Sequence, residues 1–183
     1  MATYVIIHGI GGYAGIYWQK WLHDELEKKG HTVLMPSLPE SDHPNRQTWL
    51  KLVQQIITPL EHRKTIIIAH SLGVTTALDV IESLPEPIYS LISVSGFNSD
   101  YQDELNSYFL KAKSINFNKV KNNCIHFKVI YGDNDPFIPQ RILLELAQNL
   151  GVKPTIILKG KHLDTDAGYK TFPKLLKEID SIK

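Results

Sequence analysis

Six short apolar runs, separated by longer amphipathic stretches, constrain the fold of this chain more than any other feature. The runs are rich in β-branched residues and apolar throughout, which is typical of strands covered on both faces. They are Tyr4–Ile7, Thr32–Met35, Thr65–Ala69, Tyr89–Val94, Phe127–Tyr131 and Thr155–Leu158. Helical patterns lie between the runs, and this alternation predicts βαβ units. Such units form a mainly parallel sheet with helices on both faces.

The helical patterns place apolar side chains three to four residues apart. They cover residues 18–26, 49–60, 143–150 and 172–179, and Gly151 is expected to end the third helix. Residues 96–123 are more polar, and a helix is predicted there near Asp100–Ala112, with Ser99 and Gln102 at capping-box spacing. The chain has 183 residues and no linker-like stretch, so it predicts one domain over residues 1–183 with a lid-like insertion near 96–123.

The composition excludes several classes of protein. Hydrophobic residues make up 43% of the chain, which argues against disorder, and a net charge of +1 gives no field that would attract nucleic acid or an anionic membrane. No apolar run approaches the roughly 18 residues that a membrane helix needs. The first residues lack the basic and apolar regions of a signal peptide, so we expect a cytoplasmic protein. The oligomeric state is left open.

A serine stands at the sharpest predicted corner of the chain. The segment Ala69-His70-Ser71-Leu72-Gly73 lies between the run Thr65–Ala69 and a helical stretch. Small residues two before and two after the serine allow a tight strand–turn–helix corner, the nucleophile elbow, which lifts the serine above the sheet edge. A serine that merely caps a helix is the alternative, but the strand before Ser71 and the helix after it favour a nucleophile.

An acidic turn and a histidine follow the last two predicted strands. The turn Gly132-Asp133-Asn134-Asp135 comes directly after Phe127–Tyr131, and the carboxyl ends of parallel strands border the ligand crevice. A carboxylate there can hold a histidine ring in one tautomer. Asp135 is the expected carboxylate, and Asp133 is the alternative, which would otherwise shape the turn. His162 follows the last run and completes the chain order Ser…Asp…His of α/β-hydrolases.

A glycine-rich loop, His8-Gly9-Ile10-Gly11-Gly12, follows the first predicted strand. Backbone N–H groups in such a loop can stabilise the negative oxygen of a tetrahedral intermediate. We expect Leu72 and Ile10 to donate their N–H groups there, with Gly11 a less favoured donor than Ile10. We expect Gly9, Gly11 and His70 to contact the substrate.

The same loop admits a rival interpretation as a dinucleotide-binding turn, because Gly9, Gly11 and Gly15 follow a strand. That site needs an acid at the end of the second strand, and the first acid after that strand is Glu40. The sequence also lacks the spacings of zinc and calcium sites, so no metal and no organic cofactor is expected. The single cysteine, Cys124, lies outside every motif and is expected to pack in the core.

The ordered set of motifs resembles a known family, the compact serine hydrolases of the YdeN and retinoblastoma-binding-protein-nine type. The residues that carry the resemblance are the glycine loop, Trp18–Leu22, the serine corner, residues 135–139 and Lys161-His162. The resemblance implies a reduced α/β-hydrolase fold of about six strands in the order 2-1-3-4-5-6. It also implies that Ser71, Asp135 and His162 form a catalytic triad. The chain departs from the family pattern at Ala69 and at Lys161, where glycines are frequent.

The predicted function is hydrolysis of a small carboxylic ester or thioester through an acyl-enzyme on Ser71, as in a carboxylesterase. The expected partner is a small-molecule acyl substrate. Two other hypotheses remain: a hydrolase-fold binding protein that has lost turnover, and action on an acylated or peptide-bearing protein.

Overall fold

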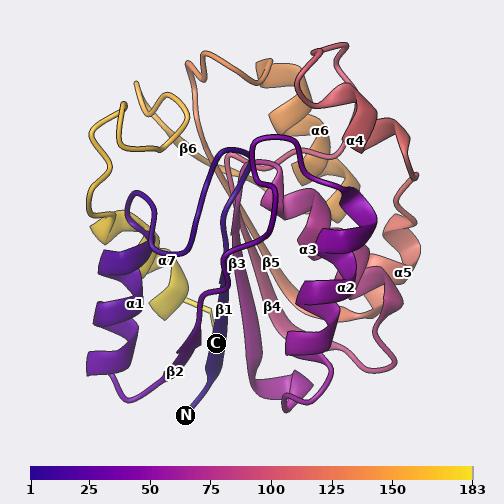
Figure 1. The fold of residues 1–183 in the computed structure, drawn as a ribbon. Coiled ribbons are helices and arrows are strands. Elements are labelled where there is room, and N and C mark those ends of the chain that lie inside the picture. Colours follow the sequence, from indigo (N-terminus) through magenta and orange to yellow (C-terminus); the bar gives the residue numbers. More distant parts are fainter. Residues whose placement is uncertain (183) are drawn as a thin grey trace.

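All strands of the sheet are parallel, and their carboxyl ends lie along one edge. The computed structural model describes residues 1–182 and joins six strands in the order β2-β1-β3-β4-β5-β6 (Figure 1). The strands are β1 (Thr3–Ile7), β2 (Thr32–Leu34), β3 (Thr65–His70), β4 (Ile88–Val94), β5 (Cys124–Gly132) and β6 (Thr155–Ile157). The predicted parallel sheet and the strand order implied by the resemblance are therefore confirmed.

Helices cover both faces of the sheet. They are α1 (Gln19–Lys28), α2 (Arg46–Ile57), α3 (Gly73–Ser83), α4 (Ser107–Lys111), α5 (Phe117–Asn122), α6 (Gln140–Leu150) and α7 (Pro173–Asp180), with a 3₁₀ turn over His62–Lys64. In Figure 1, α1 and α7 lie on one side of the strands and the other helices on the opposite side.

Successive strand residues serve two separate hydrophobic cores, because side chains alternate between the faces of a strand. Val5 and Ile7 join the core beneath α2, α3, α5 and α6. Tyr4 and Ile6 join the smaller core beneath α1 and α7. Burial on both faces explains why the strands are apolar throughout rather than alternating with polar residues.

Local signals fix three of the helix ends, of which the end at Gly151 was predicted. Asn45 accepts a hydrogen bond from the N–H of Thr48 and so caps α2. Gly151 ends α6 in the left-handed conformation, at a φ of 73°. Pro173 begins α7, where its missing N–H has no helical partner to lose.

The helix predicted near Asp100–Ala112 is wrong over its first half. Only Ser107–Lys111 form α4, and Gln102 has a φ of 65°, which a helix does not tolerate. The carboxylate of Asp100 accepts the backbone N–H of Gln102 at 2.9 Å and bends the chain into a turn instead. Ser99 donates to Glu145 of α6 at 2.5 Å rather than forming the expected capping box.

A buried arginine ties residues 109–113 to the helix that follows the serine corner. Arg46 donates from Nε and Nη2 to the Asp79 carboxylate of α3 at 2.7 and 3.1 Å. Its Nη1 donates to the carbonyl oxygens of Phe109, Leu110 and Lys113 at 2.9, 2.9 and 2.8 Å. The Asp79 side chain is 0% exposed and also accepts from Lys113 Nζ. These contacts fix the end of α4 against α3.

We predict that Arg46→Met lowers the free energy of unfolding by about 3 kcal/mol, because it leaves a buried carboxylate and three carbonyl oxygens short of donors. Urea unfolding monitored by circular dichroism measures the change. Lys20→Met is the control, since its ion pair with Asp24 is exposed and is expected to leave stability nearly unchanged. Equal stability of the two variants would contradict a stabilising role for Arg46.

Candidate active site

Ser71 leaves β3 in a strained backbone conformation. Its φ is 54°, in the left-handed region. Its N–H donates to the carbonyl oxygen of Val94 at 2.9 Å, and its own carbonyl accepts from Val74 in the first turn of α3. A Cβ on Gly73 would run into the carbonyl oxygen of His8. The corner is thus tight because the β1 loop packs directly on it, and this position needs glycine.

His162 lies between Ser71 and Asp135, so the structure brings together the three residues that the sequence singled out. His162 Nε2 is 3.0 Å from Ser71 Oγ, and Nδ1 is 2.7 Å from Asp135 Oδ2. The Asp135 side chain is fully buried. Its other oxygen, Oδ1, accepts the N–H groups of Phe137 and Ile138 at 2.9 and 3.0 Å. The carboxylate is therefore fixed on one side and free to accept from the imidazole on the other.

The alternative acid, Asp133, holds the loop that carries the histidine. Its Oδ1 accepts the N–H of Lys159 at 2.6 Å, and Asn134 Oδ1 accepts the N–H of Lys161 at 2.8 Å. Lys159 and Lys161 have φ values of 55° and 50°, which is strained for residues with side chains. A Cβ on Gly132 would collide with the Lys161 backbone. Three residues of the acidic turn thus position the loop, and the fourth, Asp135, contacts the imidazole.

A second histidine, His70, positions the first. Its Nε2 donates to the carbonyl oxygen of His162 at 3.0 Å, and Ser95 Oγ donates to the same oxygen at 3.0 Å. Since a carbonyl oxygen only accepts, Nε2 of His70 carries a proton. Burial lowers the pKa of His70 to about 3, so the ring is neutral at physiological pH. His70 also lines the cavity, but no sequence pattern indicates its bond to His162 or any role for Ser95.

The glycine loop after β1 is pressed against the serine. A Cβ on Gly9 would lie only 2.8 Å from the Cβ of Ser71. His8 holds the loop, because its Nδ1 donates to the carbonyl oxygen of Gly9 and its Nε2 accepts from the N–H of Leu38, both at 2.8 Å. The close approach to Ser71 explains why position 9 is a glycine.

The three backbone N–H groups considered for the oxyanion differ in their availability. The N–H of Gly11 donates to the carbonyl oxygen of Ser41 at 2.7 Å, and Gly11 does not line the cavity. Over residues 1–182, no hydrogen bond uses the N–H of Ile10 or of Leu72. The occupied amide of Gly11 also speaks against a dinucleotide phosphate on this loop.

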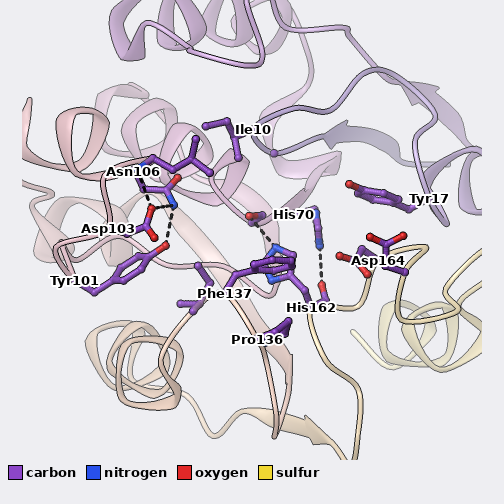
Figure 2. A pocket seen from close by; sticks show the side chains of 15 residues that line it. Ile10, Tyr17, His70, Tyr101, Asp103, Asn106, Pro136, Phe137, His162 and Asp164 are labelled. Atoms are coloured by element: carbon purple, nitrogen blue, oxygen red, sulfur yellow. Dashed lines mark hydrogen bonds between the residues drawn. The ribbon is translucent and has the colours of Figure 1, made fainter.

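A cavity of about 350 Å³ opens above Ser71 (Figure 2). Figure 2 shows Ile10, Tyr101, Asp103 and Asn106 on one side of His162, and Tyr17 and Asp164 on the other. Phe137 places its ring edge-on to His162 at 5.2 Å between centroids. One wall of the cavity comes from the segment before α4, through Tyr101, Asp103, Leu105 and Asn106.

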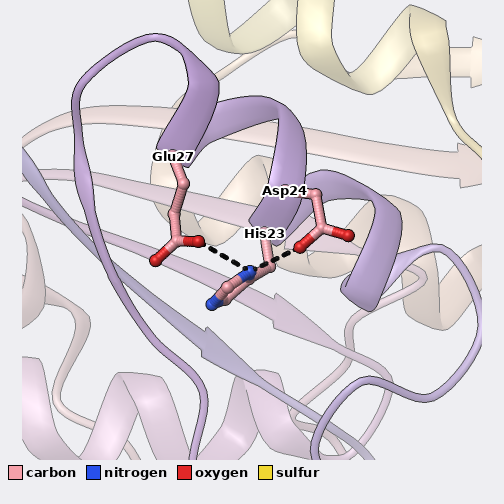
Figure 3. A group of neighbouring side chains, drawn as sticks. All are labelled: His23, Asp24 and Glu27. Atoms are coloured by element: carbon pink, nitrogen blue, oxygen red, sulfur yellow. Dashed lines mark hydrogen bonds and ion pairs between the residues drawn. The ribbon is translucent and has the colours of Figure 1, made fainter.

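Cys124 and a group of three side chains on α1 lie outside the cavity. Burial raises the pKa of the Cys124 thiol to about 12, so it is a packing residue, as expected, and not a thiolate nucleophile. Within residues 1–182, one trio has potential metal-ligand atoms within 4.8 Å of one another, namely His23, Asp24 and Glu27 on α1 (Figure 3). Lys20 Nζ already pairs with Asp24 at 2.5 Å, and the trio does not line the cavity. In the same part of the chain, no helix is long and apolar enough to cross a membrane.

We predict that His70 makes the fold sensitive to acid. Its pKa is lowered in the folded state, so below its ordinary value near 6.5 the unfolded chain binds the extra proton and stability falls with pH. The free energy of unfolding should be about 2 kcal/mol lower at pH 5 than at pH 8, because each pH unit below the ordinary pKa costs roughly 1.4 kcal/mol. Urea unfolding at both pH values should show a smaller difference for His70→Gln, which cannot titrate. An unchanged difference in His70→Gln would assign the acid sensitivity to another group.

Comparison with known proteins assigns the family. The model of the serine hydrolase family matches residues 4–181. The rat serine hydrolase RBBP9 is 32% identical over 155 residues, covering 81% of this chain and 80% of that protein. YdeN of Bacillus subtilis is 26% identical over 171 residues, covering 92% and 89% of the two chains.

Solved structures share the fold. The YdeN crystal structure superposes with a TM-score of 0.91 at 24% identity, covering 100% of this chain and 98% of the other. An extracellular α/β-hydrolase from a Paenibacillus species superposes with a TM-score of 0.70 at 21% identity, covering 98% and 97%. The sheet order, the serine corner and the family match together show that this chain belongs to the serine hydrolase family and has the α/β-hydrolase fold.

Proposed function

We propose that the protein hydrolyses small carboxylic esters or thioesters, with Ser71 as nucleophile, His162 as general base and acid, and Asp135 as its orienting partner. The observation that carries the proposal is the continuous path from Ser71 Oγ to His162 Nε2 at 3.0 Å and from Nδ1 to Asp135 Oδ2 at 2.7 Å. A serine hydroxyl is a weak nucleophile until such a base accepts its proton.

The reaction proceeds in two half-reactions. His162 Nε2 takes the hydroxyl proton as Ser71 Oγ attacks the carbonyl carbon, and Asp135 stabilises the resulting imidazolium. His162 then gives this proton to the leaving alcohol or thiol, and an acyl-serine remains. His162 then takes a proton from water as the water oxygen attacks the acyl carbon. The bond from that carbon to Ser71 Oγ breaks, the carboxylic acid leaves, and His162 returns the proton to Ser71 Oγ. This chemistry requires no metal and no organic cofactor.

The N–H groups of Ile10 and Leu72 would hold the oxyanion in both half-reactions. Both are free of acceptors over the described residues 1–182, and preorganised donors of this kind stabilise the developing negative charge. Gly9, which has no Cβ to block Ser71, would let the carbonyl approach.

We further propose one domain over residues 1–183, in which residues 96–123 are a lid-like insertion. Tyr101, Asp103, Leu105 and Asn106 of this segment line the cavity. A volume of about 350 Å³ lies at the small end of the range of ligand pockets, so a short acyl group fits best. The proposed partner is a small-molecule acyl substrate in the cytoplasm.

Substitution of the two acids of the turn should separate their roles. We predict that Asp135→Asn lowers kcat for p-nitrophenyl acetate by about 10³- to 10⁴-fold, because the imidazole loses the carboxylate that fixes its tautomer. Asp133→Asn is the matched control: it keeps an oxygen that accepts the N–H of Lys159 and should retain most activity. Ser71→Ala and His162→Ala should lower kcat further, by about 10⁶-fold. A larger loss in Asp133→Asn than in Asp135→Asn would reverse the assignment.

The acyl chain length should be limited by the cavity. We predict that kcat/KM is highest for p-nitrophenyl acetate and butyrate and falls at least about tenfold for laurate, since the longer chain finds no further apolar wall to bury against. Initial rates below the micelle concentration of each ester give the comparison. A strong preference for the laurate ester would contradict a short acyl site.

A further inference from the structure

One end of the cavity is built differently from the rest. Tyr17, Asp164 and Asp166 line it, and we call these three residues the acidic corner. The ring of Tyr17 meets the ring of His70 edge-on at 5.6 Å between centroids. Asp164 follows His162 by two residues, and Figure 2 shows Tyr17 and Asp164 beyond His70, on the side away from Ile10 and Asn106.

A carboxylate oxygen in the acidic corner lacks a partner although its residue is buried. Asp164 is only 7% exposed. Its Oδ1 accepts the N–H of Ala167 at 2.9 Å, but over residues 1–182 no hydrogen bond or ion pair reaches its Oδ2. Within the same range, Asp166 makes no ion pair either. Oδ2 is not among the enclosed, unpartnered polar atoms of the described residues, so it opens onto the cavity, where a cationic ligand can reach it.

No positive side chain of the cavity offsets these charges. The cavity lining includes a third carboxylate, Asp103. Among the described residues 1–182, no lysine or arginine lines the cavity. His70 is neutral, as described above. The cavity therefore carries a negative potential, and a low-dielectric cleft lined by one sign of charge concentrates ligands of the opposite sign.

Tyr17 adds an aromatic surface to the carboxylates. Burial raises the pKa of its hydroxyl, and the charges of Asp164 and Asp166 raise it further, so the ring stays neutral. An aromatic ring attracts a cation to its face, and recognition of quaternary ammonium groups uses this attraction. A ring beside two carboxylates therefore fits an ammonium or quaternary ammonium group.

The position of the acidic corner indicates which half of the substrate would carry this cation. His162 gives its proton to the leaving group, so the leaving group lies on the His162 side of Ser71. Figure 2 shows Tyr17 and Asp164 on one side of His162 and Ile10, the proposed oxyanion donor, on the other. We infer, on the basis of the proposed function, that the enzyme prefers esters or thioesters with a cationic group in the alcohol or thiol half. Tyr17, Asp164 and Asp166 would bind this group.

A pair of substrates of equal shape tests the inference. Acetylthiocholine carries a quaternary ammonium, and 3,3-dimethylbutyl thioacetate has a carbon in its place. The wild type should show a kcat/KM about tenfold higher for acetylthiocholine, and the double variant Asp164→Asn/Asp166→Asn should bring the ratio close to one. The amide oxygen introduced at position 164 can still accept the N–H of Ala167, so the turn is retained. A wild-type ratio at or below one would overturn the inference.

Two further variants control for net charge and for folding. Glu86→Gln/Glu104→Gln removes two negative charges from exposed residues outside the cavity, and should keep the wild-type ratio. Asp166→Asn alone changes an exposed side chain, so it should fold even where the double variant does not. It should lower the kcat/KM ratio of the two substrates to a value between those of the wild type and the double variant. Loss of the preference in the Glu86/Glu104 variant would assign it to the whole protein and overturn the inference.

Calorimetry distinguishes this inference from the proposed function, because binding does not need a working serine. Choline should bind to Ser71→Ala about tenfold more tightly than 3,3-dimethylbutan-1-ol does, and the two carboxylate substitutions in that background should remove the difference. Choline binding without any ester hydrolysis by the wild type would reject the proposed function and keep the cation site. Ester hydrolysis with equal binding of choline and the alcohol would reject the cation site alone.

Discussion

The carbonyl oxygen of His162 is the point on which the geometry of the site depends. It accepts hydrogen bonds from His70 of β3 and from Ser95, which follows β4. The loop around it holds Lys159, Lys161 and Leu163 at positive φ, and such strain persists only where neighbouring contacts outweigh it. Trp18 adds a bond from its indole nitrogen to the carbonyl oxygen of Leu163 at 2.9 Å. The imidazole is thus held through its backbone, and its two ring nitrogens remain free for Ser71 and Asp135.

The register of the parallel strands makes these bonds possible. Ile7 of β1 is level with Ala69 of β3, and His70 is level with Val94 of β4. Gly132 of β5 is level with Ile157 of β6. The glycine loop, the serine, the acidic turn and the histidine loop therefore leave the sheet at one edge, as ligand sites of open α/β sheets do. Two hydrophobic cores, one on each face, hold the strands in this register.

Sequence patterns predicted the strands and the three residues of the proposed triad, because burial on both faces and short motifs leave local traces. The strand order came from the resemblance to a known family. The patterns were wrong on the helix near Asp100–Ala112, where the side chain of Asp100 takes a backbone N–H and turns the chain. They favoured Asp135 and kept Asp133 as the alternative, since the distinction depends on contacts with a loop 26 to 27 residues further on. The bonds of His70, Ser95 and Arg46 join residues far apart in the chain, and such bonds leave no periodic signal.

Covalent labelling by a fluorophosphonate probe tests the activated serine most directly, because the probe needs an activated hydroxyl but no knowledge of the substrate. Intact mass measurement followed by peptide mapping would show whether one probe is attached and at which residue. A single adduct on Ser71 in the wild type, absent from His162→Ala, is the predicted result. A wild type that stays unlabelled, or an adduct on any other residue, would contradict a working triad and point to a hydrolase fold kept for binding alone.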